Sequence, residues 1–252
     1  MHRLGLRDDE WDRIEHLLPG RQGWVGVTAK DNRLFVEAVL YRCRTGVPWR
    51  DLPEHFGDWK NIHRRYSRWA KSGVWERVFE HLAADADHEY AMLDSTVVRA
   101  HQHSAGAPKT DGDGQATGRS RGGLSTKIHT LVDALGNPVN FHLTGGEAHD
   151  LVGADHLLPD MQADVLIADK AYDADERVIK PLAAAGKRAV IPPKANRRSP
   201  RKFDRHLYKT RHLIENFFAK LKQFRAVATR YDKTARNFLA TVHLAAIAIL
   251  LN

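Results

Sequence analysis

Hydrophobic residues in the first eighty or so positions recur at the three- and four-residue spacing of helices. Asp8 and Asp9 can cap a first helix and Asp31 can cap a second, and a third helix should follow from about Asp58. The first two helices should end at the turns that begin with Pro19 and Gly46. All six tryptophans lie in this region, which suits a small domain that must fill its core with few side chains. The pattern therefore predicts an all-α domain over residues 1–86.

From Tyr90 onwards the spacing changes to that of strands. Strands are expected over residues 90–98, 128–132, 138–143, 164–169 and 188–192, with helices over 174–185, 205–224 and 233–251. A polar loop rich in glycine and serine, about 104–123, separates the first strand from the next two and should be mobile without a partner. Residues 87–252 are thus predicted to form an α/β domain, with a mixed sheet flanked by helices.

The helix, turn and helix of residues 31–71 are compatible with a helix-turn-helix variant that contacts DNA. Arg64, Arg65 and Arg68 lie on or near the expected exposed side of its last helix, where they would bind the nucleic acid. A small helical domain with a solvated basic face explains the same pattern. The helical spacing alone leaves both interpretations open.

The composition favours a cytoplasmic protein. Cys43 is the single cysteine, so the chain cannot form an internal disulfide, and its first residues lack the apolar core of a signal peptide. The longest mostly apolar run, residues 238–251, is shorter than the roughly 20 residues that cross a bilayer. We therefore expect no association with a membrane.

Positive charge is concentrated in one segment. Residues 186–236 contain sixteen lysines and arginines against three acids, so this segment has a net charge of +13 while the whole chain has +8. Such asymmetry is typical of a protein that binds a polyanion, because each phosphate neutralised by Lys or Arg releases counterions. A merely solvated basic face is the alternative.

Two acids are placed by predicted strands. Asp94 lies in the middle of an apolar strand, where an acid is unfavourable unless a cation or hydrogen-bond donor meets it. Asp169 ends the buried strand before the helix of residues 174–185, and the carboxyl ends of such strands commonly bind ligands. A helix cap is the ordinary explanation for an acid at the position of Asp169.

A third acid shares a helix face with cations. At about 100° per residue, Tyr208, Arg211, Glu215 and Lys222 fall on one side of the helix, and the apolar residues fall on the other. A salt bridge on a helix surface would explain Glu215 with one base, but it does not explain the whole row. The row places one carboxylate among groups that can hold a DNA backbone.

Carboxylates from two strands and a helix are the ligands that a pair of Mg²⁺ ions needs, and Mn²⁺ is expected to substitute for Mg²⁺. Two such ions can activate the attacking oxygen and stabilise the leaving oxygen in a displacement at phosphorus. Asp94, Asp169 and Glu215 are therefore the candidate catalytic residues and metal ligands. Zinc is disfavoured, because the pair His101 and His103 lacks a cysteine cluster or a further histidine motif.

The spacing of Tyr208, Arg211, Glu215 and Lys222 resembles the Y-R-E-K signature of the DDE transposases of bacterial insertion sequences, in the group that includes the IS-four and IS-five families. The segments LDSTVVRAH around Asp94 and IADKAYDA are similar to the other two acidic blocks of that group. GRSRGGLSTKIH at 118–129 and the amino-terminal LRDDEWDRIEHLLPG also match. The resemblance covers nearly the whole chain.

This resemblance implies an RNase H-like catalytic domain that cleaves 3′ ends at the terminal inverted repeats of an insertion sequence and transfers them into target DNA. It implies double-stranded DNA as partner, a homodimer or larger assembly on DNA, and a location at the bacterial nucleoid. In contrast to larger relatives, the 46 residues between Asp169 and Glu215 leave no room for an inserted β-domain. A nuclease without strand transfer and a domesticated DNA-binding regulator remain as alternatives.

Further residues are candidates for supporting roles. The expected DNA contacts are Tyr208, Arg211, Lys222, Lys127, Arg64, Arg65, Arg68, Arg119 and Arg121. Lys127 could equally be a solvated strand lysine. His149 and Asp150 are candidates for holding the metal ligands in place rather than the metal itself.

Overall fold

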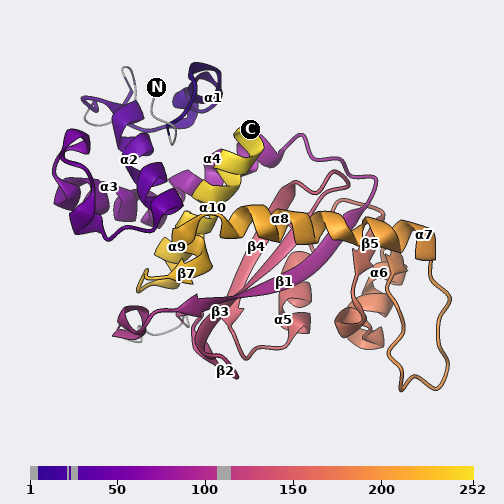
Figure 1. Ribbon diagram of the computed structural model, residues 1–252. Helices are drawn as coiled ribbons and strands as arrows, with labels where there is room; N and C mark the ends of the chain where they lie inside the picture. The colour runs from indigo at the N-terminus through magenta and orange to yellow at the C-terminus, as the bar shows by residue number, and fades with distance from the viewer. Residues whose placement is uncertain (1–4, 22, 24–27, 107–114) are drawn as a thin grey trace. The chain divides into compact units, whose positions relative to one another are not determined.

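The computed structural model describes residues 5–21, 23, 28–106 and 115–252. The chain forms two compact units, which we call the helical unit (Met1–Ala84 with Leu221–Asn252) and the sheet unit (Asp85–Lys220). Figure 1 traces the chain through both. Each unit has its own core and is described separately.

The helical unit contains the three helices predicted over the first part of the chain, together with further helices and a short strand. Its elements are α1 (Asp8–Asp12), α2 (Asn32–Thr45), α3 (Trp59–Lys71), α4 (Val74–Ala83), α9 (Arg225–Ala228), the short β7 (Thr229–Arg230) and α10 (Ala235–Leu251). Asp31 caps α2 by accepting from the Leu34 N–H at 2.8 Å. Gly46 ends α2 in the left-handed conformation (φ 71°), which glycine adopts without steric cost. The first predicted helix is shorter than expected, and α4 was not predicted.

The C-terminal helix α10 lies in this compact unit, whereas the sequence prediction placed it with residues 87–252. Eleven of its seventeen residues are buried, so the helix is apolar on nearly all sides and needs several partners. It packs against α2, α3 and α4, and the Tyr66 hydroxyl donates to the Asn237 carbonyl at 2.6 Å. A buried ion pair between Arg42 and Asp232 (3.3 Å) adds a second link.

The sheet unit alternates strands and helices after an antiparallel start. Its elements are β1 (Ala91–Ala100), β2 (Gly118–Ser120), β3 (Gly123–Val132), β4 (Pro138–Gly145), α5 (Asp150–Leu157), β5 (Val165–Ala168), α6 (Lys180–Ala184), β6 (Arg188–Val190), α7 (Arg205–Tyr208) and α8 (His212–Lys222). The last two residues of α8 are counted with the helical unit.

The strands lie in the order β4-β3-β1-β5-β6. The strands β1, β3 and β4 are antiparallel neighbours, whereas β5 runs parallel to β1 and β6 runs parallel to β5. The short β2 pairs with residues 123–125 of β3, beyond the part that pairs with β4. Three antiparallel strands followed by two parallel ones in this order define an RNase H-like fold, so the predicted fold class is confirmed.

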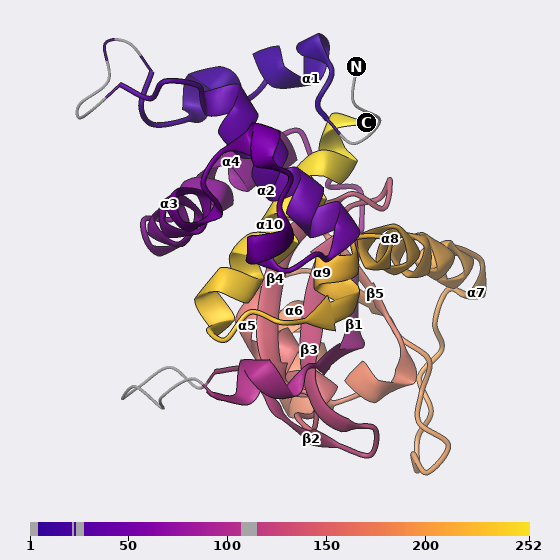
Figure 2. The same cartoon turned by 60° about the vertical axis from the view of Figure 1, so that its left-hand side comes forward.

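Helices cover both faces of the sheet. Leu93, Leu131 and Leu166 point to one face, where they form a core with residues of α5 and α6. Gly153 lets α5 lie close to β3, because a Cβ atom at this position would lie 2.2 Å from the His129 ring nitrogen Nδ1. The other face meets α8, whose Phe217 ring lies 6.0 Å from Phe141 of β4. Figure 1 and the turned view in Figure 2 show α8 and α5 on opposite sides of the strands.

Four parts of the sheet unit differ from the prediction. The helix α5 and the strand β2 were not expected. The helix predicted over 174–185 begins with a π-helical turn, Asp175–Ile179, and the one predicted over 205–224 is interrupted by a 3₁₀ turn, Lys209–Arg211. Residues 107–114 of the loop predicted to be mobile lie outside the described residues. Among the described residues, no helix has the length and apolar character needed to cross a membrane.

Candidate active site

The register of the sheet brings Asp94 and Asp169 side by side. In the parallel pair of β1 and β5, Leu93 lies opposite Ala168, and each aspartate is the next residue along its strand. Because the two strands run in the same direction, both carboxylates emerge at corresponding positions. Alternation along β1 turns Asp94 away from Leu93, toward the face that α8 covers.

Asp94 is largely buried and is held by two donors. Its Oδ1 accepts from the Ser95 N–H at 2.8 Å, and its Oδ2 accepts from Arg211 Nη1 at 2.6 Å. Burial raises the pKa of Asp94 above its ordinary value, and the nearby charge of Asp169 raises it further, against the effects of Ser95 and Arg211. The acid within the apolar strand is therefore met by a cation, the guanidinium of Arg211.

Asp169 is the N-cap of a 3₁₀ turn, Lys170–Tyr172, where its Oδ1 accepts from the Ala171 N–H at 2.8 Å. The capping interpretation is thus correct for this oxygen. Within the described part of the chain, Oδ2 accepts no hydrogen bond, which leaves it able to take a further ligand. Capping and ligand binding are compatible at this residue.

Glu215 lies in the first turn of α8 and meets Asp94 through one arginine. Arg211 donates Nη2 to Glu215 Oε1 and Nη1 to Asp94, so one guanidinium joins the helix to the strand. The side chain of Glu215 is 57% exposed. Burial lowers the pKa of Arg211, but Asp94 outweighs this effect and the net shift is upward. The structure therefore brings Asp94, Arg211 and Glu215 together.

The two other members of the predicted row are placed differently. Tyr208 ends α7, packs edge-on against Phe203 and lies close enough to Arg211 to raise its pKa. Lys222 is the last residue of α8 and is counted with the helical unit. The 3₁₀ turn before α8 also departs from the continuous helix on which the predicted row was drawn.

A polar layer lies under Asp94, on the face of the sheet that α5 covers. The Ser95 hydroxyl donates to Asp150 Oδ1 at 2.6 Å, and Lys127 Nζ donates to the same oxygen at 3.0 Å. Burial raises the pKa of Asp150, but the hydrogen bonds from Ser95 and Lys127 outweigh it, and the net shift is downward. Asp150 thus holds the residue that donates to Asp94.

Lys127 corrects an expectation. It was a candidate DNA contact, but it is only 9% exposed, and its ammonium group also donates to the Ala148 carbonyl at 2.5 Å. A buried, paired ammonium group is not available to a phosphate. His149 caps α5 by accepting from the Leu151 N–H through Nδ1 at 3.2 Å, which is a structural role.

Tyr172 was missed by sequence analysis. It is fully buried, and its pKa is raised first by burial and then by the charges of Asp150, Asp94 and Asp169. The phenol is therefore close enough to feel the charges of all three acids. Its position three residues after Asp169 was the available signal.

The remaining predicted DNA contacts divide into exposed and packed residues. Arg64 and Arg68 are exposed on α3, and Arg119 and Arg121 are exposed at β2 and the turn after it. Arg65 instead stacks on the rings of Phe35 and Trp69, at 4.2 and 4.7 Å, within the core of the helical unit. Its guanidinium therefore has a packing role.

The donor set of the site fits a hard divalent cation, because Asp94, Asp169 and Glu215 offer only carboxylate oxygens. In the conformation seen here Arg211 supplies the positive charge between Asp94 and Glu215. Accordingly, among the described residues no three potential ligands are gathered closely enough to hold one ion. Such binding requires the Arg211 side chain to move.

Comparisons with known proteins agree with this picture. The family described as "Putative transposase of IS4/5 family" matches residues 6–79, and the family "Transposase DDE domain" matches residues 85–251. A protein of Sinorhizobium fredii, "Uncharacterized protein y4sN", is 48% identical over 43% of this chain and 86% of its own length. The "Putative transposase for insertion sequence element IS6501" of Brucella ovis is 40% identical over 50% of this chain and 98% of its own length.

Solved structures of the Mos1 transposase are also similar in a loose sense. A pre-cleavage transpososome is 9% identical, with a TM-score of 0.29 over 90% of this chain and 80% of the other. A paired-end complex with Mn is 12% identical, with a TM-score of 0.29 over 96% and 86%. TM-scores this low support no argument about this chain.

The RNase H-like fold carries one aspartate within β1, one just after β5 and a glutamate on α8. This arrangement defines a carboxylate-bearing enzyme that acts on nucleic acid. The second family match covers more than half of the chain. The chain therefore belongs to the DDE transposases, of the type found in IS4/5 insertion sequences, and is a DNA transposase.

Proposed function

We propose that this transposase cleaves the 3′ ends of its own insertion sequence at the terminal inverted repeats and joins them to target DNA in one site. Asp94, Asp169 and Glu215 are the catalytic residues. The observation that carries the proposal is the register of β1 and β5, in which each aspartate directly follows one member of the pair Leu93 and Ala168, together with Arg211, which ties Glu215 to Asp94.

The three carboxylates would hold two Mg²⁺ ions, or Mn²⁺ in their place. When bound, such ions supply activation of the attacking oxygen and stabilisation of the leaving oxygen. Asp94 is kept in position by the Ser95 N–H, and Asp169 by its capping bond to Ala171. Arg211 moves from the carboxylates to a phosphate of the DNA, so its charge serves the apo site first and the substrate second.

Asp150 supports this arrangement from the layer below. It fixes the Ser95 side chain, and Ser95 is the residue whose N–H orients Asp94. Lys127 neutralises Asp150 inside the protein. We propose Asp150 and Lys127 as positioning residues, since neither touches the reacting atoms.

DNA is bound outside the carboxylates by exposed cations. We propose Arg64 and Arg68 on α3, Arg119 and Arg121 near β2 and Lys222 at the end of α8 for this role, with Tyr208 at the end of α7 as a further, uncharged contact. Because two ends must be held for joining, the active species is a homodimer or a larger assembly on DNA at the nucleoid.

The test is an assay of the purified full-length protein with Mg²⁺ or Mn²⁺ on duplexes that carry the inverted repeats bracketing its gene. The expected products are nicks at the repeat ends and end-joined DNA, and scrambled repeats should give neither. Cutting without end preference or joining would identify a nuclease instead. Binding without cutting, unchanged in Asp94→Asn, would identify a DNA-binding regulator.

A further inference from the structure

The loop between β6 and α7, residues 192–204, has no role in the site described above, and we call it the basic loop. It contains five cations, Lys194, Arg197, Arg198, Arg201 and Lys202, and one acid, Asp204. The Asp204 carboxylate is used to cap α7, where it accepts from the N–H groups of His206 and Leu207. The loop is therefore a strongly positive segment whose one acid is already engaged.

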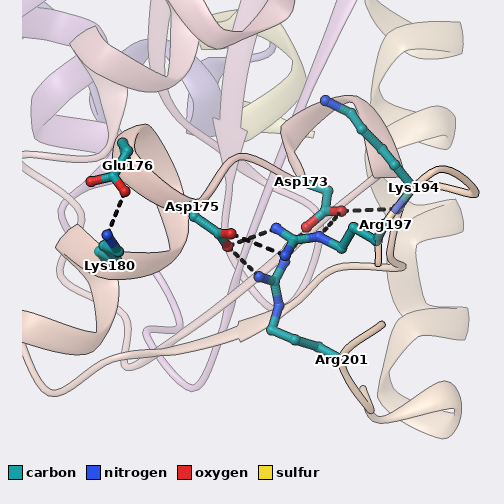
Figure 3. A network of polar contacts seen from close by, with 7 residues as sticks. All are labelled: Asp173, Asp175, Glu176, Lys180, Lys194, Arg197 and Arg201. Carbon is teal, nitrogen blue, oxygen red and sulfur yellow. Dashed lines mark hydrogen bonds and ion pairs between the residues drawn. The ribbon is translucent and has the colours of Figure 1, made fainter. Parts of the chain in front are cut away.

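Two aspartates outside the loop hold it in one shape (Figure 3). The Asp173 side chain has no solvent exposure and accepts from the Lys194 N–H at 2.8 Å, from Arg197 Nε at 2.6 Å and from Arg201 Nη2. Asp175 accepts from both terminal nitrogens of Arg197, at 3.0 and 2.6 Å, and from Arg201 Nη1 at 2.5 Å. We call this pair with its two arginines the aspartate clamp.

The aspartate clamp leaves three cations of the basic loop free. In the described part of the chain the side chains of Lys194, Arg198 and Lys202 form no ion pair with an acid, and the last two are exposed. Figure 3 shows the Lys194 side chain extending away from the clamp although its N–H donates to Asp173. The contacts therefore fix the backbone and neutralise two arginines, while the other charges remain available.

The stiffness of the loop suits a binding surface better than a merely solvated one. Three prolines and the clamp restrict the backbone before any partner arrives, which lowers the entropy lost on binding. A loop that only had to stay soluble would need neither feature. Cations held at fixed positions on a short loop match the regularly spaced phosphates of a nucleic acid backbone.

We propose that the basic loop binds the backbone of duplex DNA beside the active site, and that Asp173 is the positioning residue that shapes it. The loop leaves β6, the neighbour of β5 and Asp169, and leads into the segment with Arg211 and Glu215. DNA held by the loop is thus the DNA presented to the carboxylates. This inference rests on the proposed function for the identity of the polyanion.

The first test measures binding of a labelled repeat-end duplex by the full-length protein, without divalent metal, over a series of salt concentrations. The double variant Arg198→Gln/Lys202→Gln should bind about tenfold more weakly, with the salt slope reduced by about two, because roughly 0.9 counterion is released per phosphate contact. The matched control is Arg177→Gln/Lys180→Gln, which removes the same charge from exposed cations elsewhere in the sheet unit. The control should keep both affinity, within about twofold, and slope.

The second test compares Asp173→Asn with Glu176→Gln, since each adds the same charge and Glu176 pairs with Lys180 outside the aspartate clamp. If Asp173 shapes the loop, Asp173→Asn weakens DNA binding about fivefold although it makes the protein more positive, and trypsin cuts the loop faster. Glu176→Gln should bind as well as wild type or better. Tighter binding in both variants would mean that Asp173 only neutralises charge, and that the positioning role is wrong.

Binding without metal separates this inference from the proposed function. An unchanged affinity and salt slope in Arg198→Gln/Lys202→Gln, with wild type still cutting repeat ends, would overturn the basic loop as a DNA surface. If binding depends on the loop but the protein never cuts DNA, the basic loop is supported as a DNA-binding surface and the proposed cleavage and joining reactions are overturned. The exposed double variant keeps the inference testable even where Asp173→Asn does not fold.

Discussion

Asp169 and Asp173 lie four residues apart on one segment and have opposite surroundings. Asp169 accepts one backbone hydrogen bond through Oδ1 and has an oxygen left for another ligand. Asp173 is fully buried, and both of its oxygens are occupied by donors of the basic loop. In the sequence IADKAYDA the two acids look equally suited to bind a cation.

The comparison teaches that a carboxylate can bind a metal ion only if one of its oxygens is not already occupied by protein donors. Asp169 has such an oxygen and Asp173 does not. A carboxylate can accept about four hydrogen bonds or metal contacts, and those taken by fixed protein donors are lost to an ion. The two arginines that meet these acids differ in the same way. Each arginine bridges two carboxylates, but the Asp173 partner of Arg197 has no solvent exposure, whereas the partners of Arg211, Asp94 and Glu215, are 20% and 57% exposed.

The largest expected effect is on chemistry. Asp169→Asn should lower repeat-end cleavage by on the order of a thousandfold or more, because a carboxamide is a poor ligand for a hard cation. Asp94→Asn and Glu215→Gln should behave alike, and all three should still bind DNA. Asp173→Asn, assayed at saturating DNA, should stay within about tenfold of wild type. Equal losses in Asp169→Asn and Asp173→Asn would remove the distinction.

The second effect is on stability. Here Asp173→Asn should have the larger effect and Asp169→Asn the smaller, the reverse of their order for cleavage. Asp173→Asn should lower the free energy of unfolding by about 2 kcal/mol, because two guanidinium groups and an N–H lose a charged acceptor that is itself fully buried. Asp169→Asn should change it by less than about 0.5 kcal/mol, since asparagine also caps helices. Urea unfolding followed by circular dichroism measures both. A stable Asp173→Asn protein would contradict the clamp.

The arginines should separate by their effect on metal binding. Arg211→Gln removes the cation that lies between Asp94 and Glu215, so Mn²⁺ should bind roughly fivefold more tightly. The same variant should bind DNA with a flatter salt dependence. Arg197→Gln is the control and should leave Mn²⁺ binding unchanged. Calorimetric titration of the DNA-free protein gives the affinities. Weaker Mn²⁺ binding in Arg211→Gln would refute the proposal that Arg211 supplies the positive charge between the carboxylates until metal binds.

The smallest effect is on pH dependence. Burial raises the pKa of Asp173, but hydrogen bonds from Arg197 and Lys194 outweigh it, and the net pKa lies below the ordinary value of 3.8. The stabilisation is therefore complete above that value and is lost as the pH falls below it. The stability difference between wild type and Asp173→Asn should be constant above about pH 4.5 and narrow at lower pH. A difference that stays constant to pH 2 would exclude the ionised clamp.

Local chemistry made much of this protein predictable from its sequence. The cap at Asp31 and the glycine stop at Gly46 set the ends of α2, because both act within one turn of the helix. The apolar runs around Asp94 and before Asp169 defined β1 and β5. The helix α5 and the 3₁₀ turn before α8 were not predicted, because their sequence patterns are short and their conformations depend on packing against the sheet.

The sequence by itself determined which groups could do chemistry, since three acids and a basic carboxyl-terminal segment are facts of composition and order. Only the tertiary structure decided which of them meet. Strand pairing set Asp94 beside Asp169, a buried partner removed Lys127 from the candidate DNA contacts, and the aspartate clamp assigned Asp173 to the basic loop. The physical reason is that a side chain's role depends on its desolvation and on its nearest charges, and both come from residues distant in the chain.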